Sequence, residues 1–193
     1  MYNLNRDFNN QTILACDDQG NFQQYISRVE GHTGEGRRHL AITVLLYNEK
    51  DKVLLQKRKH KIFDNIYDFT GSTHPVKKTS GGHESLEECT RRCLEDEYYI
   101  DEKIKLKNLG FFNYFEKYGE LCENQQAVFC ENEHCAMMVG EYNGKVNLNP
   151  ESGYSYKWID KSLFLEEIKN NPKNYCPWVI EGVKSLNLQN FKK

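Results

Sequence analysis

The sequence contains little that would direct a protein to a membrane or to a large polyanion. Its 193 residues carry 26 Lys and Arg against 28 Asp and Glu, and the formal charge of −2 provides no basic excess for nucleic acid. The longest apolar run, residues 40–47, is far short of the roughly 20 residues that cross a bilayer. The first residues show no basic segment followed by an apolar one, so we see no signal peptide. These features predict a cytoplasmic protein that binds neither nucleic acid nor membrane.

Proline is scarce, with 4 residues, and the cysteine count of 7 is odd. An odd number of cysteines without an export signal is typical of reduced thiols, which excludes a disulfide scaffold. Hydrophobic residues make up 38% of the chain and charged residues 28%, as in a folded protein rather than a disordered one. A chain of this length predicts a single domain, residues 1–193, and leaves open whether it is a monomer or a homodimer.

Hydrophobic patterning predicts an α/β (α+β) fold in which strands surround one long helix. Residues 40–47 are apolar enough for a buried strand, and residues 52–58 follow a polar turn as the hairpin partner. A helix is predicted over 84–97, which is rich in Glu, Leu and Arg and lacks Gly and Pro. The remaining predicted elements are strands at 109–118, 126–130, 135–140 and 154–159, a hairpin turn at 143–144, and helices at 162–170 and 178–188.

The predicted helix carries an acidic pattern that suits a metal-bound diphosphate. Glu84 is followed eight residues later by Arg92, and Asp96 and Glu97 come one turn further on. Several hard oxygen ligands on one helix can hold Mg²⁺ against a diphosphate. Taken alone, the stretch is also explained by a solvated helix face with ordinary i,i+4 ion pairs.

A second candidate site comes from three histidines and two carboxylates outside this helix. His32 and His39 lie seven residues apart, His74 precedes a proline, and Glu131 and Glu133 share one face if their segment is a strand. Three imidazoles and two carboxylates suit a six-coordinate ion such as Mn²⁺ or Mg²⁺, or Zn²⁺ with expanded coordination. Each histidine by itself is more often a surface or core residue than a ligand.

Taken in order, these motifs resemble type I isopentenyl-diphosphate isomerase, a divergent branch of the Nudix superfamily. The matching stretches are His32-x6-His39-Leu40-Ala41, Ser72-Thr73-His74-Pro75, the acidic helix, Glu131-Asn132-Glu133, Tyr156-Lys157-Trp158 and Cys176-Pro177-Trp178. The resemblance covers a core of about residues 28–185. It implies a Nudix-type α/β/α sandwich with a mixed sheet and additional C-terminal helices, and a small prenyl diphosphate as substrate.

The resemblance also implies a role for each matching residue. The metal ligands would be His32, His39, His74, Glu131 and Glu133, with Mg²⁺, Mn²⁺ or Zn²⁺ as the ion. Glu97 would hold a second Mg²⁺ with the diphosphate, although alignment on Arg91-Arg92-Cys93 would shift this role to Asp96. The phosphate-binding positions would be Arg28, Lys59, Lys61 and Arg92.

For the chemistry, the resemblance implies that Glu133 delivers a proton with Tyr114, which is a looser match, and that Trp178 faces the isoprenoid cation. Ser72 stands where the family has its acid–base cysteine. A serine hydroxyl ionises far less readily than a thiol and needs an adjacent base, which predicts a slow isomerase or one that relays protons through water.

Cys93 is the other departure, because it replaces the first carboxylate of the metal-binding stretch in hydrolytic Nudix proteins. The sequence therefore ranks isomerisation of isopentenyl and dimethylallyl diphosphates above two alternatives. One is Nudix phosphohydrolysis of a nucleoside or prenyl diphosphate. The other is a non-catalytic protein that binds a prenyl diphosphate.

Overall fold

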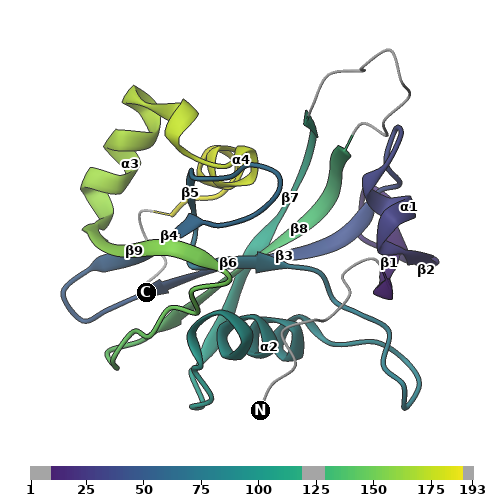
Figure 1. The fold of residues 1–193 in the computed structure, drawn as a ribbon, viewed down its shortest axis with the longest axis horizontal. Coiled ribbons are helices and arrows are strands. Elements are labelled where there is room, and N and C mark those ends of the chain that lie inside the picture. The colour runs from purple at the N-terminus through teal and green to yellow at the C-terminus, as the bar shows by residue number, and fades with distance from the viewer. Residues whose placement is uncertain (1–9, 119–128, 189–193) are drawn as a thin grey trace.

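The computed structural model describes residues 10–118 and 129–188 (Figure 1). In chain order its elements are β1 (Thr12–Cys16), β2 (Phe22–Ser27), α1 (Arg28–His32), β3 (His39–Tyr47), β4 (Lys52–Arg58), β5 (Tyr67–Asp68), β6 (Gly71–Thr73), α2 (Leu86–Tyr98), β7 (Leu106–Tyr118), β8 (Phe129–Glu141), β9 (Gly153–Asp160), α3 (Lys161–Asn170), η2 (Pro172–Asn174) and α4 (Pro177–Ser185). Within these two segments, every helix is too short or too polar to span a bilayer.

The strands form one mixed, nine-stranded sheet in which β3 has the largest number of neighbours. β3 pairs antiparallel with β1, β4 and β6 and parallel with β8. The parallel register starts with His39 opposite Glu133. β7 continues the sheet beyond β8, and β9 continues it beyond β4, both antiparallel. Two predicted ligands from distant parts of the chain thus become neighbours through strand pairing.

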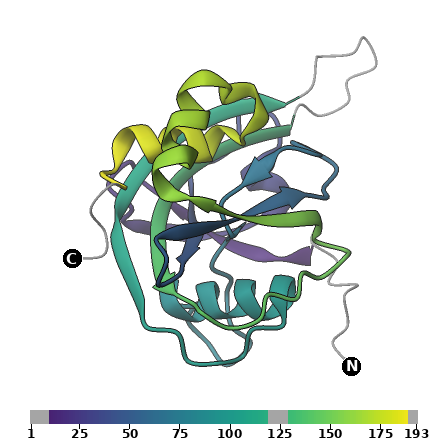
Figure 2. The same cartoon turned by 90° about the vertical axis from the view of Figure 1, so that its left-hand side faces the viewer.

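Helices cover both faces of the sheet, with α2 on one side and α3 and α4 on the other (Figures 1 and 2). Alternate residues of β3 face the two layers. Ala41 and Leu45 belong to the core that includes Phe164 of α3. Ile42 and Val44 belong to the core under α2. Because both faces are covered, the strand is apolar along nearly its whole length, and the predicted α/β/α sandwich is confirmed.

Helix α2 forms where the sequence predicts it because its ends and its apolar face are both specified locally. Ser85 caps the helix by accepting a hydrogen bond from the Glu88 N–H, and the Glu88 carboxylate accepts one from the Ser85 N–H. Cys89, Cys93 and Leu94 are buried at helical spacing. The helix therefore presents one fixed face to the sheet.

Several other predicted elements need correction. The strands predicted at 126–130 and 135–140 are parts of one strand, β8, and residues 126–128 lie outside the described residues. Polar residues between them interrupt the apolar pattern, and two of these, Glu131 and Glu133, belong to the candidate site. Residues 143–144 do not close a hairpin, because β8 pairs with β3 and β7 whereas β9 pairs with β4. β1, β2, α1 and the short β5 and β6 were not predicted.

Candidate metal centre and adjoining pocket

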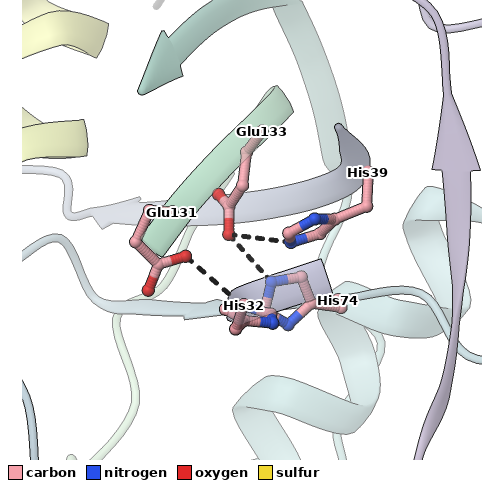
Figure 3. Close-up of side chains that lie close together, drawn as sticks. All are labelled: His32, His39, His74, Glu131 and Glu133. Carbon is pink, nitrogen blue, oxygen red and sulfur yellow. Dashed lines mark hydrogen bonds and ion pairs between the residues drawn. The ribbon is translucent and has the colours of Figure 1, made fainter. Parts of the chain in front are cut away.

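The five predicted metal ligands meet in one buried cluster (Figure 3). His32 ends α1, His39 begins β3, and His74 follows β6, while the two carboxylates lie on β8. One ligand atom from each residue lies within 4.8 Å of every other: His32, His39, His74, Glu131 and Glu133. Residues that are scattered over the sequence therefore form a set compact enough to share one cation.

Strand pairing and a glycine bring the cluster together. Glu131 and Glu133 occupy alternate positions of β8 and so project on the same side of the strand. Gly31 permits α1 to lie against β3, because a Cβ atom at this residue would lie 3.1 Å from His39 Nδ1 and 2.8 Å from Ile13 Cδ1. A larger residue at position 31 would push His32 away from the other ligands.

Hydrogen bonds to the backbone set the tautomers of two histidines. His32 Nδ1 donates to the carbonyl oxygen of Arg28 at 2.8 Å, and His39 Nδ1 donates to that of Arg37 at 2.7 Å. The lone pair of each Nε2 then points into the cluster, which is the arrangement found in metal-binding histidines.

The cluster contains buried acceptor atoms that face one another with no donor hydrogen between them. His32 Nε2 lies 3.3 Å from Glu131 Oε2, and neither atom has a hydrogen-bond partner among the described residues. His39 Nε2 lies 3.6 Å from Glu133 Oε1 and also has no hydrogen-bond partner among the described residues, whereas Glu133 Oε1 contacts His74 Nε2 at 2.8 Å. Converging buried lone pairs are costly unless a cation joins them, so the residues present fit a divalent metal.

The electrostatics of the cluster agree with this fit. Burial lowers the pKa of His32 and, more strongly, that of His74, so both imidazoles are neutral, as metal binding requires. Burial and the adjacent Glu133 raise the pKa of Glu131 well above its ordinary range. Burial of Glu133 acts to raise its pKa, but the adjacent His39 and His74 imidazoles outweigh this effect and hold the pKa well below its ordinary range.

Tyr114 extends the cluster with a proton donor. It lies opposite Glu133 in the β7–β8 pair, and its hydroxyl donates to Glu133 Oε2 at 2.5 Å. Burial, and then the charge of Glu133, raise the pKa of the Tyr114 phenol well above its ordinary value. The pair thus consists of a protonated phenol and a carboxylate that could also hold a metal.

A pocket adjoins the cluster and connects it to other predicted site residues. His74, Glu131 and Glu133 line it together with Ser72, Tyr114 and Trp178. The pocket therefore combines the candidate metal ligands with the candidate acid–base residues and with the indole expected to face a cation.

Trp178 is held in a single orientation. Its Nε1 donates to Asp68 Oδ1 at 2.6 Å, and the Arg58 guanidinium lies 4.9 Å from the ring centroid. Phe63 packs edge-on against the indole with ring centroids 5.4 Å apart. These contacts leave the indole as a rigid aromatic wall of the pocket.

The phosphate-binding candidates separate in the structure. Arg28 lines the pocket, whereas Lys59 binds the carbonyl oxygen of Pro150 at 2.8 Å and Lys61 is exposed. Arg92 is paired with Glu84 at 2.7 Å and donates to the carbonyl oxygen of His74 at 2.8 Å. Arg92 thus connects α2 to the segment that carries His74, and it lies outside the pocket lining.

Two further lining residues, Arg58 and His60, were missed in the sequence. Partial burial of its ring, followed by the charge of Arg58, lowers the pKa of His60 to about 4, although the residue as a whole is exposed. Both belong to the basic run at residues 57–61. Alternation along a strand indicates that some of these side chains face inward, but it does not decide which ones.

Helix α2 directs Glu97 rather than Asp96 toward the sheet. Gln56 Nε2 donates to Glu97 Oε2 at 2.6 Å, and a Cβ atom at Gly71 of β6 would lie 3.1 Å from the same oxygen. Burial raises the pKa of Glu97 to about 7. Asp96 has a side chain that is 32% exposed and lies 3.9 Å from the Arg92 guanidinium.

Comparison with known proteins agrees with this geometry. The NUDIX domain family model matches residues 37–179. The isopentenyl-diphosphate Delta-isomerase of Haloarcula marismortui is 30% identical over 176 residues, covering 87% of this chain and 87% of that protein. The protein of the same name from Halobacterium salinarum is 29% identical over 178 residues, covering 87% of this chain and 76% of that one.

Two solved structures share the fold. A Deinococcus radiodurans protein superposes with a TM-score of 0.66 at 13% identity, covering 91% of this chain and 99% of that one. A MutT protein from Methanosarcina mazei gives 0.53 at 18% identity, covering 77% and 91%. The family match spans most of the sheet and two of its covering helices, and the chain therefore belongs to the NUDIX domain family.

Proposed function

We propose that this protein interconverts isopentenyl and dimethylallyl diphosphate in a metal-dependent reaction. The observation that carries the proposal is the pocket in which three residues of the five-ligand cluster, His74, Glu131 and Glu133, meet Tyr114 and the Trp178 indole. The relatives named isopentenyl-diphosphate Delta-isomerase, which align over most of the chain, support the same reaction.

In this proposal His32, His39, His74, Glu131 and Glu133 hold a divalent cation, either Mn²⁺, Mg²⁺ or Zn²⁺. When bound, the cation supplies positive charge that holds the two buried carboxylates together and strengthens the acidity of groups beside it. Glu97, on the inner face of α2, would hold Mg²⁺ once the substrate diphosphate is bound. Its half-buried carboxylate suits a ligand that is completed only when substrate is present.

The chain's own residues supply the proton chemistry. Moving an unactivated double bond requires one carbon to be protonated and the neighbouring carbon to lose a proton, with water kept away from the cation between them. Tyr114 and Glu133 deliver the first proton from their side of the pocket. The indole of Trp178 stabilises the tertiary carbocation, a contribution of roughly 0.5–2 kcal/mol in a dry site.

The remaining pocket residues recognise the substrate and complete the proton transfer. Arg28 and Arg58 provide guanidinium groups, which match phosphate oxygens better than ammonium groups do. Lys59 and Lys61 follow Arg58 in the chain but do not line the pocket, so we assign them no contact with the diphosphate. Ser72 accepts the proton that leaves the substrate, in the position expected for the family's cysteine.

Hydrolysis of a diphosphate is less well supported by the same residues. Cys93 contributes a buried thiol where a hydrolase needs a carboxylate, and Glu84 is engaged by Arg92. Of Glu84, Cys93, Asp96 and Glu97, which carry the acidic pattern and its cysteine replacement, only Glu97 then offers an inward-facing carboxylate. One carboxylate is a poor basis for the metal cluster that activates water.

The deciding experiment is deuterium exchange. Purified protein is incubated with isopentenyl diphosphate, Mg²⁺ and Mn²⁺ in D₂O, and we expect deuterium in the prenyl chain with no phosphate release. Glu133→Gln should abolish exchange, whereas Glu141→Gln at the exposed end of β8 should not. Absence of exchange in the wild type would exclude the isomerase.

The same incubation identifies the alternatives. Release of phosphate or pyrophosphate that Glu97→Gln abolishes would indicate a hydrolase. Thermal stabilisation by the prenyl diphosphate without any turnover would indicate a binding protein.

A further inference from the structure

A buried carboxylate lies directly behind Ser72. Ser72 on β6 lines the pocket, whereas Asp68 on β5 is 0% exposed. The two side chains are joined by a hydrogen bond of 3.1 Å from Ser72 Oγ to Asp68 Oδ1. A serine that lacks the acidity of a thiol therefore has a proton acceptor in contact with it, on the side away from bulk solvent.

The carboxylate is firmly positioned by its other contacts. Trp178 Nε1 donates to Asp68 Oδ1 at 2.6 Å, and the Phe69 N–H donates to the same oxygen at 2.7 Å. Arg58 donates to Oδ2 at 2.9 Å. Each of these donors keeps Asp68 fixed relative to the pocket wall, so the carboxylate and the Ser72 hydroxyl keep a defined geometry.

The Ser72 hydroxyl has one proton and two acceptors within reach. Thr43 Oγ1 also lies 3.1 Å from Ser72 Oγ, but the Thr43 hydroxyl donates its own proton to the Gly71 carbonyl oxygen at 3.2 Å. A carboxylate is the stronger acceptor, because hydrogen bonds to charged groups are about twice as strong as neutral ones. Ser72 thus donates to Asp68 and can accept from Thr43 only if Thr43 turns away from Gly71.

We infer that Asp68 is the positioning residue that lets Ser72 replace the missing thiol, by receiving through the Ser72 hydroxyl the proton that leaves the substrate. This inference rests on the proposed isomerisation. The substrate C–H bond breaks and its electron pair forms the new C=C bond. The proton goes to Ser72 Oγ while the former Ser72 O–H proton passes to Asp68 Oδ1. Exchange with water after turnover returns Asp68 to the carboxylate.

The surroundings of Asp68 suit this task. Burial raises the pKa of its carboxyl, against the charge of Arg58, and so makes the protonated form accessible. The other titratable groups around it are Glu97 and Tyr98 from α2, Cys176 at the start of α4 and Cys135 from β8. Among the described residues, Asp68 supplies the carboxylate that accepts the hydrogen bond of the Ser72 hydroxyl.

A double-mutant cycle with Ser72→Cys tests the inference. A cysteine ionises by itself, so it does not need the carboxylate behind it. We expect Asp68→Asn to lower kcat for deuterium exchange by about 100-fold in the Ser72 protein, an effect typical of a lost general base. In the Ser72→Cys protein the same substitution should lower kcat by no more than about threefold. KM should change little in either background.

Asp68→Asn leaves Arg58 without its counter-ion and can prevent folding, so Asp68→Glu is made in parallel. This variant keeps the charge but displaces the carboxylate from Ser72, and we expect the same dependence on residue 72. Thr43→Val is the matched control, because it removes the other neighbour of Ser72 and should leave kcat unchanged.

The outcomes separate the two proposals. Equal losses of kcat in the wild-type and Ser72→Cys backgrounds would show that Asp68 only supports the structure, and would overturn the inference while leaving the isomerase intact. A loss in Thr43→Val as large as that in Asp68→Glu would overturn it as well. A wild-type protein without exchange activity would refute the proposed function and this inference together.

Discussion

Tyr114 and Glu133 face each other across the β7–β8 pair, and the phenol donates a 2.5 Å hydrogen bond to the carboxylate. The same carboxylate contacts His74 at 2.8 Å through its other oxygen. Glu133 therefore belongs at once to the candidate metal cluster and to the candidate acid. This double role links metal binding to proton delivery.

We expect Tyr114→Phe to lower kcat for deuterium exchange by about 100-fold or more, the usual effect of losing a general acid. The phenyl ring fills the same space, so bound metal, measured by atomic emission, should stay at the wild-type amount. Tyr118→Phe changes an exposed tyrosine on the same strand and serves as the control. An unchanged kcat in Tyr114→Phe would remove Tyr114 from the mechanism.

Metal removal should lower the stability of the wild-type protein. A cation that binds only the folded state adds about 2.7 kcal/mol to the free energy of unfolding when present at 100 times its Kd. Glu131→Gln should abolish most of this gain, and its apo form should be more stable than the wild-type apo form because a buried pair of carboxylates is relieved. Thermal melts with and without Mn²⁺ or Zn²⁺ measure both effects.

The control for this experiment is Glu141→Gln, at the exposed end of the same strand. Its melting temperature should rise with metal as much as that of the wild type. A metal response that is equally strong in Glu131→Gln would mean that the ion binds elsewhere.

The pH dependence of stability should report on Glu97. Burial raises its pKa from the ordinary 4.5 to about 7, so the folded state retains a proton that the unfolded state releases. The stabilising contribution is therefore complete below pH 4.5 and is lost as the pH rises through 7. Glutamine does not ionise, so the Glu97→Gln protein does not lose this stability as the pH rises. At pH 8 its free energy of unfolding should exceed that of the wild type by on the order of 1–3 kcal/mol.

Urea unfolding of the metal-free proteins at pH 4.5 and pH 8 measures the difference. The two proteins should have nearly equal stability at the lower pH. Asp101→Asn removes a charge from an exposed position and should not reproduce the effect. A Glu97→Gln protein that is less stable than the wild type at pH 8 would contradict the assigned direction.

Arg92 and Glu84 should behave as a structural pair. Their side chains are 15% and 12% exposed, and removing one partner of such a pair leaves the other poorly solvated. We expect Arg92→Gln and Glu84→Gln each to lower the free energy of unfolding by about 2–4 kcal/mol, somewhat less than for a fully buried pair. KM for the diphosphate should stay the same.

Arg28→Gln is the comparison for substrate binding, since Arg28 lines the pocket. It should raise KM with a smaller effect on stability. If Arg92→Gln and Lys59→Gln raise KM as much as Arg28→Gln does, then Arg92 and Lys59 also belong to the phosphate-binding site.

Local patterns allowed α2 and β3 to be predicted from the sequence. The capping residue Ser85, the apolar spacing of Cys89, Cys93 and Leu94, and the continuous apolar run of β3 all act over a few residues. β8 was divided into two predicted strands because its ligands are polar, although Glu131 and Glu133 are buried. The buried polar residues of the candidate site thus disturbed the pattern that identifies a strand.

The sequence by itself determined the chemistry of the five candidate ligands and the acidic pattern of the helix, and it led us to expect that Ser72 stands in place of a cysteine. The sequence did not determine which of the residues in or beside a motif face the interior or the pocket. Tertiary packing decided that Glu97 rather than Asp96 turns inward, that Arg58 and His60 line the pocket, and that Asp68 lies behind Ser72. The reason is distance along the chain. The hydrogen bond between Trp178 and Asp68 joins residues 110 positions apart, and neither helical nor strand periodicity carries information over such a separation.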